Sequence, residues 1–199
     1  MRIGVLASGG GTNLQSIIDA CTRGEISGEV VLVISNNSTA GALERARKAK
    51  IAIHHVSSVT HPDLAARDSA ILGAFADHRV DLVCLAGYMK KLGLPVLREY
   101  RNRVLNIHPA LLPAFGGHGM YGMEVHRAVL ASGTGVTGPT VHLVNAEFDA
   151  GPILAQREVP VIKGDTPETL QKRVLEAEHR MYPSTIEAYN QGVIAVYGG

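Results

Sequence analysis

The stretch "RIGVLASGGGTNLQSIIDAC", residues 2–21, decides the fold. It begins with a short apolar run, passes through three consecutive glycines and continues with apolar residues spaced about 3.6 positions apart. Continuous apolar runs suit strands that are covered on both faces, and the 3.6 spacing suits a helix packed on such a strand. The stretch therefore predicts a strand, a glycine loop and a helix, which is the first half of a βαβ unit.

The same alternation continues through the first half of the chain. Short, β-branched apolar runs predict strands at 29–35, 51–56, 81–87 and 103–108. The segments between them have helical spacing and predict helices at 13–21, 40–49, 63–78 and 92–100. This order is typical of an α/β fold with an open, mostly parallel, twisted sheet, Rossmann-like βαβ units and right-handed crossovers.

The second half has a different pattern. A Gly-rich loop at 116–122 precedes an expected helix at 123–131. Two strand-like runs follow at 135–144 and 152–161, and the short connection between them predicts an antiparallel extension of the sheet.

A long helix is expected to close the chain at 164–192. Thr166 can cap this helix and Pro167 suits its first position, whereas Pro183 should kink or restart it. We expect a single domain, 1–199, made of two halves, 1–108 and 109–199.

Composition excludes several functional classes. The chain has 199 residues, a formal net charge of +1 and 46% hydrophobic residues, and its charges of both signs are interspersed. We therefore expect neither a nucleic-acid partner nor a membrane partner. The N-terminal apolar run is too short for a signal peptide or a membrane span, so a cytoplasmic location is expected.

The glycine loop after the first strand predicts a phosphate site. Glycines allow close approach of a ligand to the backbone, and the first amides of a helix attract anions. A Walker A loop is excluded because no lysine follows the glycines, and a dinucleotide is disfavoured because Leu14 breaks the GxGxxG spacing. A single phosphate monoester fits better, with a tight turn capped by Thr12 and Gln15 as the alternative.

The stretch "VLNIHPALLPAF", residues 104–115, places two polar side chains at the end of a buried strand. Asn106 and His108 have the same parity, so they should point to one face, at the edge where open α/β sheets place their ligands. An amide donor beside an imidazole suits a reaction in which a carbonyl oxygen gains negative charge while a proton moves.

Asp149, in "EFDAGP", is the candidate acidic partner. It either forms a turn, raises the pKa of the imidazole or relays a proton from the attacking group. The motifs of a covalent catalyst are missing from the sequence, which favours direct transfer between two bound substrates. The histidines do not have metal-ligand spacing, so no metal is expected.

Several motifs in this order resemble the phosphoribosylglycinamide formyltransferases, a family of folate-dependent enzymes, over roughly residues 1–190. They are "VLASGGGTNLQSIIDAC", "VCLAGYMKKL", "VLNIHPALLPAF", "TGPTVHLVNAEFDAGPILAQREVPV" and "EAEHRMYP". The resemblance implies an open α/β sheet, no metal, and transfer of a formyl group from the co-substrate 10-formyltetrahydrofolate to the amine of glycinamide ribonucleotide in purine biosynthesis.

The resemblance also implies that the half 1–108 binds the phosphate and the ribonucleotide, and that 109–199 is the folate-binding and closing half. It implies residue roles as well. Asn106 would stabilise the oxyanion, and His108 would act as general acid with its pKa raised by Asp149. The ribonucleotide would be bound by Gly11, Thr12, Asn13 and Glu178. The folate would be bound by Met89, Lys90, Lys91, Leu92, Asn106, Asn145, Ala146, Glu147, Phe148 and Asp149. The partners would be these small molecules alone, the chain a monomer or homodimer, and the Leu112–Pro113 bond cis.

Three positions and one segment depart from that family pattern. Lys90 and Leu64 stand where relatives often have arginine, and Leu175 stands where a polar side chain is common. The segment 116–126 is longer than in relatives, and it is either a lid or a surface loop. The alternatives to formyl transfer are a related 10-formyltetrahydrofolate hydrolase and a catalytically silent folate- or nucleotide-binding module.

Overall fold

The computed structural model describes residues 1–194, in which strands and helices alternate as the first half of the sequence predicts. The strands are β1 (Arg2–Leu6), β2 (Glu29–Ser35), β3 (Ala52–His55), β4 (Leu82–Leu85), β5 (Val104–His108), β6 (Val136–Thr137), β7 (Thr140–Leu143), β8 (Ile153–Gln156) and β9 (Val159–Pro160). The helices are α1 (Thr12–Thr22), α2 (Gly41–Lys48), α3 (Leu64–Asp77), α4 (Leu94–Glu99), α5 (Met123–Ser132) and α6 (Pro167–Asn190).

The sheet order is β3-β2-β1-β4-β5-β7-β8, which confirms the predicted fold class. β1 pairs in parallel with both β2 and β4, and β2 pairs in parallel with β3. The chain divides within β5 into two compact units, Met1–Leu105 and Asn106–Gly199. The expected halves, 1–108 and 109–199, have nearly the same boundary, and the single-domain arrangement stays a prediction.

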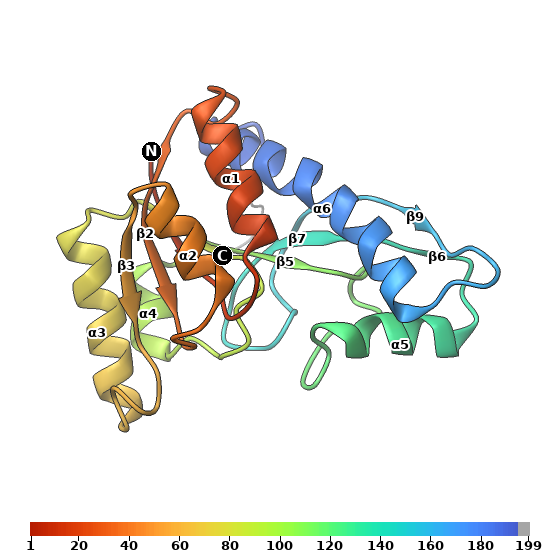
Figure 1. Ribbon diagram of the computed structural model, residues 1–199, viewed down its shortest axis with the longest axis horizontal. Helices are drawn as coiled ribbons and strands as arrows, with labels where there is room; N and C mark the ends of the chain where they lie inside the picture. Colours follow the sequence, from red (N-terminus) through yellow and green to blue (C-terminus); the bar gives the residue numbers. More distant parts are fainter. Residues whose placement is uncertain (195–199) are drawn as a thin grey trace. The chain divides into compact units, whose positions relative to one another are not determined.

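The first unit follows from its apolar strands. All four residues of β4 are buried, as are the last four of both β1 and β2, so these strands are covered on both faces. In Figure 1, α1 and α2 lie in front of the strands and α4 lies behind them. Helix α3 begins where Asp63 caps it, because the Asp63 carboxylate accepts the N–H of Ala66 at 3.0 Å.

In the second unit each of the two expected long strands is divided in two. The run 135–144 gives β6 and β7, interrupted at Gly138 and Pro139, and the run 152–161 gives β8 and β9. A Cβ at Gly138 would lie 1.8 Å from the carbonyl oxygen of Arg157, so the close approach of the two segments requires glycine there. The predicted antiparallel pairing is confirmed for β7 with β8 and for β6 with β9.

Helix α6 confirms two predictions about its start and excludes one of the two alternatives predicted for Pro183. Thr166 caps it by accepting the N–H of Thr169 at 3.3 Å, and Pro167 is its first residue. No new helix begins at Pro183, because α6 continues through that residue as one element. Beside β9, α6 packs with α5 (Figure 1) around buried apolar side chains, namely Val129, Val159, Leu170, Val174 and Ala177.

Candidate active site

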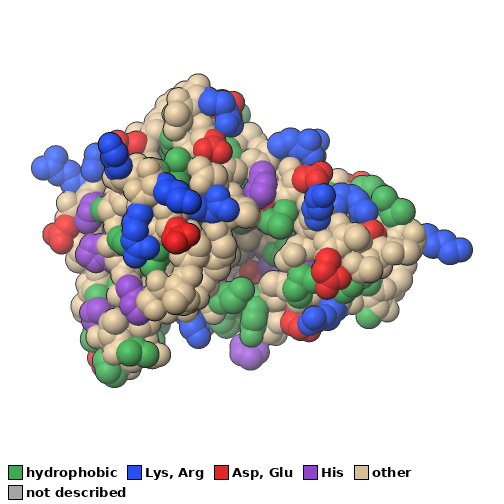
Figure 2. All heavy atoms as spheres, in the orientation of Figure 1, with side chains coloured by type: hydrophobic (Ala, Val, Ile, Leu, Met, Phe, Trp, Pro, Cys, Tyr) green, Lys and Arg blue, Asp and Glu red, His purple; other side chains and the backbone are tan. Residues whose placement is uncertain are grey.

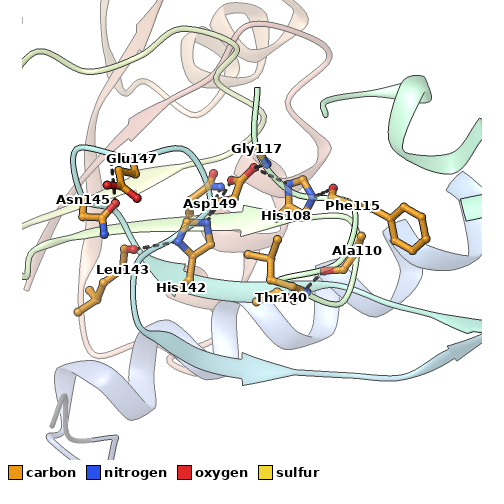
Figure 3. A network of polar contacts seen from close by, with 12 residues as sticks. His108, Ala110, Phe115, Gly117, Thr140, His142, Leu143, Asn145, Glu147 and Asp149 are labelled. Carbon is orange, nitrogen blue, oxygen red and sulfur yellow. Dashed lines mark hydrogen bonds and ion pairs between the residues drawn. The ribbon is translucent and has the colours of Figure 1, made fainter. Parts of the chain in front are cut away.

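Asn106 and His108 lie at the carboxyl end of β5, as the sequence predicts, and both reach one polar cluster in the second unit. The Asn106 amide nitrogen Nδ2 lies 3.1 Å from His142 Nε2. His108 is 3% exposed, and its Nδ1 lies 3.6 Å from Asp149 Oδ2. Figure 3 shows His108, His142 and Asp149 grouped together, with Asp149 between the two imidazoles. Two strands and a loop therefore supply the candidate site.

The second ring nitrogen of His108 is held by the backbone. His108 Nε2 lies 2.8 Å from the carbonyl oxygen of Phe115 (Figure 3). A carbonyl oxygen only accepts, so Nε2 carries the hydrogen and donates it. In the neutral ring this leaves Nδ1 as the atom that exchanges a proton, on the side that faces Asp149.

Asp149 is held by the Gly-rich loop and lies close to His142. Its Oδ2 accepts the backbone N–H of Gly117 at 3.0 Å, and its Oδ1 lies 3.5 Å from His142 Nε2. The backbone of Asp149 is left-handed, with φ of 52°, a conformation that aspartate tolerates better than most residues. The Gly-rich loop therefore contacts the candidate carboxylate directly, through Gly117.

The pKa values of His108 and Asp149 differ in part from expectation. Burial lowers the pKa of His108 below its ordinary value, and this outweighs the opposing effects of the Asp149 charge and the Phe115 carbonyl. Asp149 thus raises the pKa of His108 as predicted, but burial makes the net shift downward. Burial would raise the pKa of Asp149, but His142, the His108 charge and the Gly117 N–H together lower it.

Sequence reasoning missed two residues of this site, His142 and Thr140, both on β7. His142 is 2% exposed and contacts both Asn106 and Asp149. Thr140 is fully buried and its hydroxyl donates to the carbonyl of Ala110 at 2.7 Å. The signal was available, because "TVHLV" places two polar side chains of equal parity in an apolar strand, as "VLNIH" does.

The candidate phosphate loop lies in the first unit. Gly11 has φ of 74°, and a Cβ there would lie 2.6 Å from Ala42 Cα, so only glycine fits. Ser8 fixes the start of the loop, since its N–H donates to the Gly87 carbonyl at 3.0 Å. Gly11 is also the N-cap of α1 and no side chain caps that helix, so the alternative of a Thr12 capping box is wrong.

The other predicted binding residues are divided between the units. In the first unit, Thr12 is exposed and Asn13 is buried, while Met89, Lys90 and Lys91 are exposed and Leu92 is buried. In the second unit, Glu178 is buried on α6, and the loop before Asp149 is exposed at Asn145, Ala146, Glu147 and Phe148. The Phe148 ring packs edge-on against His118 of the Gly-rich loop, with ring centroids 5.9 Å apart.

Three further observations concern possible ligands and surfaces. In residues 1–194, no group of three or more His, Cys, Asp or Glu side chains has an arrangement that could hold a metal ion. Over the same range, every helix is too short or too polar to cross a bilayer. On the face shown in Figure 2, basic and acidic side chains are interspersed.

The βαβ sheet, the polar end of β5 and its acidic partner are the features that the resemblance to the formyltransferases implies. A family model described as formyl transferase matches residues 1–186, and the chain belongs to this family. A solved structure of glycinamide ribonucleotide transformylase 1 from Symbiobacterium toebii is 47% identical, with a TM-score of 0.94 over 100% of this chain and 91% of that one.

Two curated relatives point to the same member of the family. The chloroplastic phosphoribosylglycinamide formyltransferase of Arabidopsis thaliana is 44% identical over 94% of this chain. The phosphoribosylglycinamide formyltransferase of Escherichia coli (strain K12) is 39% identical over 99% of this chain and 91% of its own length. The chain spans 64% of the length of the Arabidopsis relative.

Proposed function

We propose that the chain transfers the formyl group of 10-formyltetrahydrofolate to the amine of 5'-phosphoribosylglycinamide, giving the N-formyl product and tetrahydrofolate. The observation that supports this most directly is the cluster of Asn106, His108 and Asp149 at the end of β5. It combines an amide donor, an imidazole with one nitrogen left to exchange a proton, and a carboxylate. The names of the similar proteins supply the substrates.

In the proposed reaction the amine nitrogen attacks the formyl carbon, and a new C–N bond forms. The carbonyl electrons move to oxygen, and an N–H of Asn106 stabilises the oxyanion. The C–N bond to N10 of the folate then breaks as the carbonyl re-forms. The proton lost by the attacking nitrogen reaches N10 through Nδ1 of His108, with Asp149 stabilising the imidazolium. Burial of His108 lowers its pKa and so makes the imidazolium a stronger acid.

The binding roles belong to the same proposal. Gly11, Thr12 and Asn13 hold the phosphate at the start of α1, and Glu178 meets the glycinamide end. The folate contacts Asn106, Asp149 and two groups of mainly exposed residues: Met89, Lys90, Lys91 and Leu92; and Asn145, Ala146, Glu147 and Phe148. Lys90 offers a point charge rather than the planar fork of arginine. A cytoplasmic location, and a monomer or homodimer that uses no metal, stay predictions.

The test is a transfer assay with purified protein, 10-formyltetrahydrofolate and glycinamide ribonucleotide, in which absorbance reports tetrahydrofolate. His108→Ala should abolish most turnover, and Asn106→Ala should cost about 2.7–4 kcal/mol of transition-state stabilisation, the usual loss for an oxyanion donor. Tetrahydrofolate release without the ribonucleotide would favour the hydrolase alternative. Binding of both substrates without turnover would favour the silent module, and unchanged turnover in His108→Ala would refute the mechanism.

A further inference from the structure

We infer that His142 is a positioning residue that sets the orientation of the Asn106 amide. The inference rests on the proposed function, in which an N–H of Asn106 stabilises the oxyanion. An asparagine amide has a donor side and an acceptor side, and rotation by 180° exchanges them. Asn106 can serve the oxyanion only if something distinguishes the two orientations.

The tautomer of His142 follows from its backbone contact. His142 Nδ1 lies 2.8 Å from the carbonyl oxygen of Leu143 (Figure 3). Because a carbonyl oxygen only accepts, Nδ1 carries the hydrogen, and Nε2 of the neutral ring is an acceptor. This contact is closely packed, since a Cβ at Gly151 would lie 1.8 Å from the same carbonyl oxygen.

The acceptor at Nε2 selects one orientation of Asn106. The Asn106 amide nitrogen lies 3.1 Å from Nε2 and donates to it, which leaves its second N–H for the oxyanion. In the rotated amide, the carbonyl oxygen would face the Nε2 lone pair, and the two acceptors would repel each other. His142 is 2% exposed, so water cannot easily relieve that repulsion.

The backbone of β7 and β8 aims His142 at this position. The pairing of the two strands shifts register between Val141 and His142, so that Val141 faces Ala155 and His142 faces Ile153. Such irregularities redirect side chains and are common beside active sites. Asn106 from β5 and His142 from β7 therefore meet in one fixed geometry.

Protonation of His142 would reverse the preference. With hydrogens on both ring nitrogens, Nε2 would oppose the Asn106 N–H and donate to Asp149 Oδ1, which lies 3.5 Å away. The titratable groups that face His142 are Asp149 and His108, which interact with it electrostatically. The neutral ring thus orients Asn106, and the charged ring binds Asp149 instead.

Two substitutions separate positioning from packing. The side chain of His142→Gln reaches the place of Nε2 and restores an acceptor there, whereas that of His142→Asn reaches only the place of Nδ1. Both are polar and neither titrates. We expect His142→Asn to lower kcat by at least ~10-fold with KM within ~3-fold, and His142→Gln to stay within ~3-fold of the unchanged protein, since loss of a whole oxyanion donor costs ~10²–10³.

The same pair is then measured in an Asn106→Ala background. If His142 acts through Asn106, the two His142 variants should have equal kcat there, within ~2-fold. The inference would be overturned if His142→Asn lowered kcat in the Asn106→Ala background by as much as it does with Asn106 present. It would also be overturned if His142→Asn left kcat unchanged with Asn106 present.

A measurement without substrates keeps this inference separate from the proposed function. Nitrogen NMR of the labelled full chain near neutral pH should show the Nδ1–H tautomer of His142 and a coupling from the Asn106 amide to Nε2. The Nε2–H tautomer would overturn the inference whatever the activity. The expected tautomer and coupling in a protein without formyl transfer would support the positioning geometry and refute the proposed reaction.

Discussion

Replacing Thr140 with valine removes a buried hydroxyl that holds the chain just after β5. Thr140 Oγ1 donates to the carbonyl of Ala110 at 2.7 Å and accepts the N–H of Leu112 at 3.0 Å. The side-chain amide of Gln156 donates to the same oxygen at 2.9 Å. Because valine has nearly the shape of threonine, the substitution removes hydrogen bonds with little change in packing.

The size of the effect follows from these three bonds. A hydrogen bond between neutral groups contributes about 0.5–1.5 kcal/mol net, and a buried donor left without a partner costs about 1–3 kcal/mol. Thr140 is fully buried, and the Leu112 N–H would lose its acceptor. We expect Thr140→Val to lower the free energy of unfolding by about 2–4 kcal/mol, the combined effect of these losses.

Thr137 provides a matched control. It is 2% exposed, it lies on β6, and its hydroxyl has no hydrogen-bond partner within residues 1–194. Burial of an unpaired hydroxyl is unfavourable, so Thr137→Val should leave the free energy of unfolding unchanged or raise it by about 1 kcal/mol. The two variants make the same chemical change at equally buried positions and differ only in the bonds lost.

Urea unfolding followed by circular dichroism at pH 7 measures both variants. In thermal unfolding of a chain of this size, a loss of about 2–4 kcal/mol in Thr140→Val corresponds to a fall in Tm of roughly 5–15 °C. If Thr137→Val were destabilised as much as Thr140→Val, the loss would come from packing, and the reasoning would be refuted. If neither variant changed stability, Thr140 would not hold the segment after β5.

Two further predictions concern groups near the cluster. His126 is 2% exposed, and burial, then the His108 charge, lowers its pKa to about 4. The unfolded chain therefore binds this proton first as pH falls below about 6.5, and roughly 3 kcal/mol of stability should be lost by pH 4. His126→Leu should flatten that slope in urea titrations, and an unchanged slope would contradict the assignment. A Cβ at Gly116 would lie 2.5 Å from Leu112 Cδ2 and 3.2 Å from Asp149 Cβ, so Gly116→Ala should displace both side chains and lower kcat by ~10-fold through the shift of the carboxylate. Gly135→Ala, whose Cβ would meet nothing within 4 Å, should not change kcat, and equal losses in both would contradict this account.

The first half of the fold could be predicted because each local pattern agreed with its final environment. Buried parallel strands need continuous apolar runs, and β1, β2 and β4 have them. The second half was less predictable, since Gly138 divides a strand for a reason that lies on another segment. The close approach of the Arg157 carbonyl, which only glycine permits, cannot be inferred from the neighbours of Gly138 in sequence.

The candidate site, like the fold, could be predicted from the sequence only in part. Parity placed Asn106 and His108 on one face, and the structure gives both a place in one cluster. The net direction of the His108 pKa was not predictable, because it depends on the balance of burial against the Asp149 charge. The backbone donor at Gly117 and the acceptor at Phe115 were missed because a sequence pattern carries no information about where backbone groups point.

These backbone contacts explain why the segment after β5 must be held so firmly. The Phe115 carbonyl fixes which nitrogen of His108 carries a hydrogen, and the Gly117 N–H fixes Asp149. Both groups lie only a few residues beyond Ala110 and Leu112, the backbone positions that Thr140 binds. A shift of this segment would move the acceptor of one catalytic candidate and the donor of the other together. Thr140→Val should therefore reduce kcat even at temperatures where the variant is fully folded, which Thr137→Val should not.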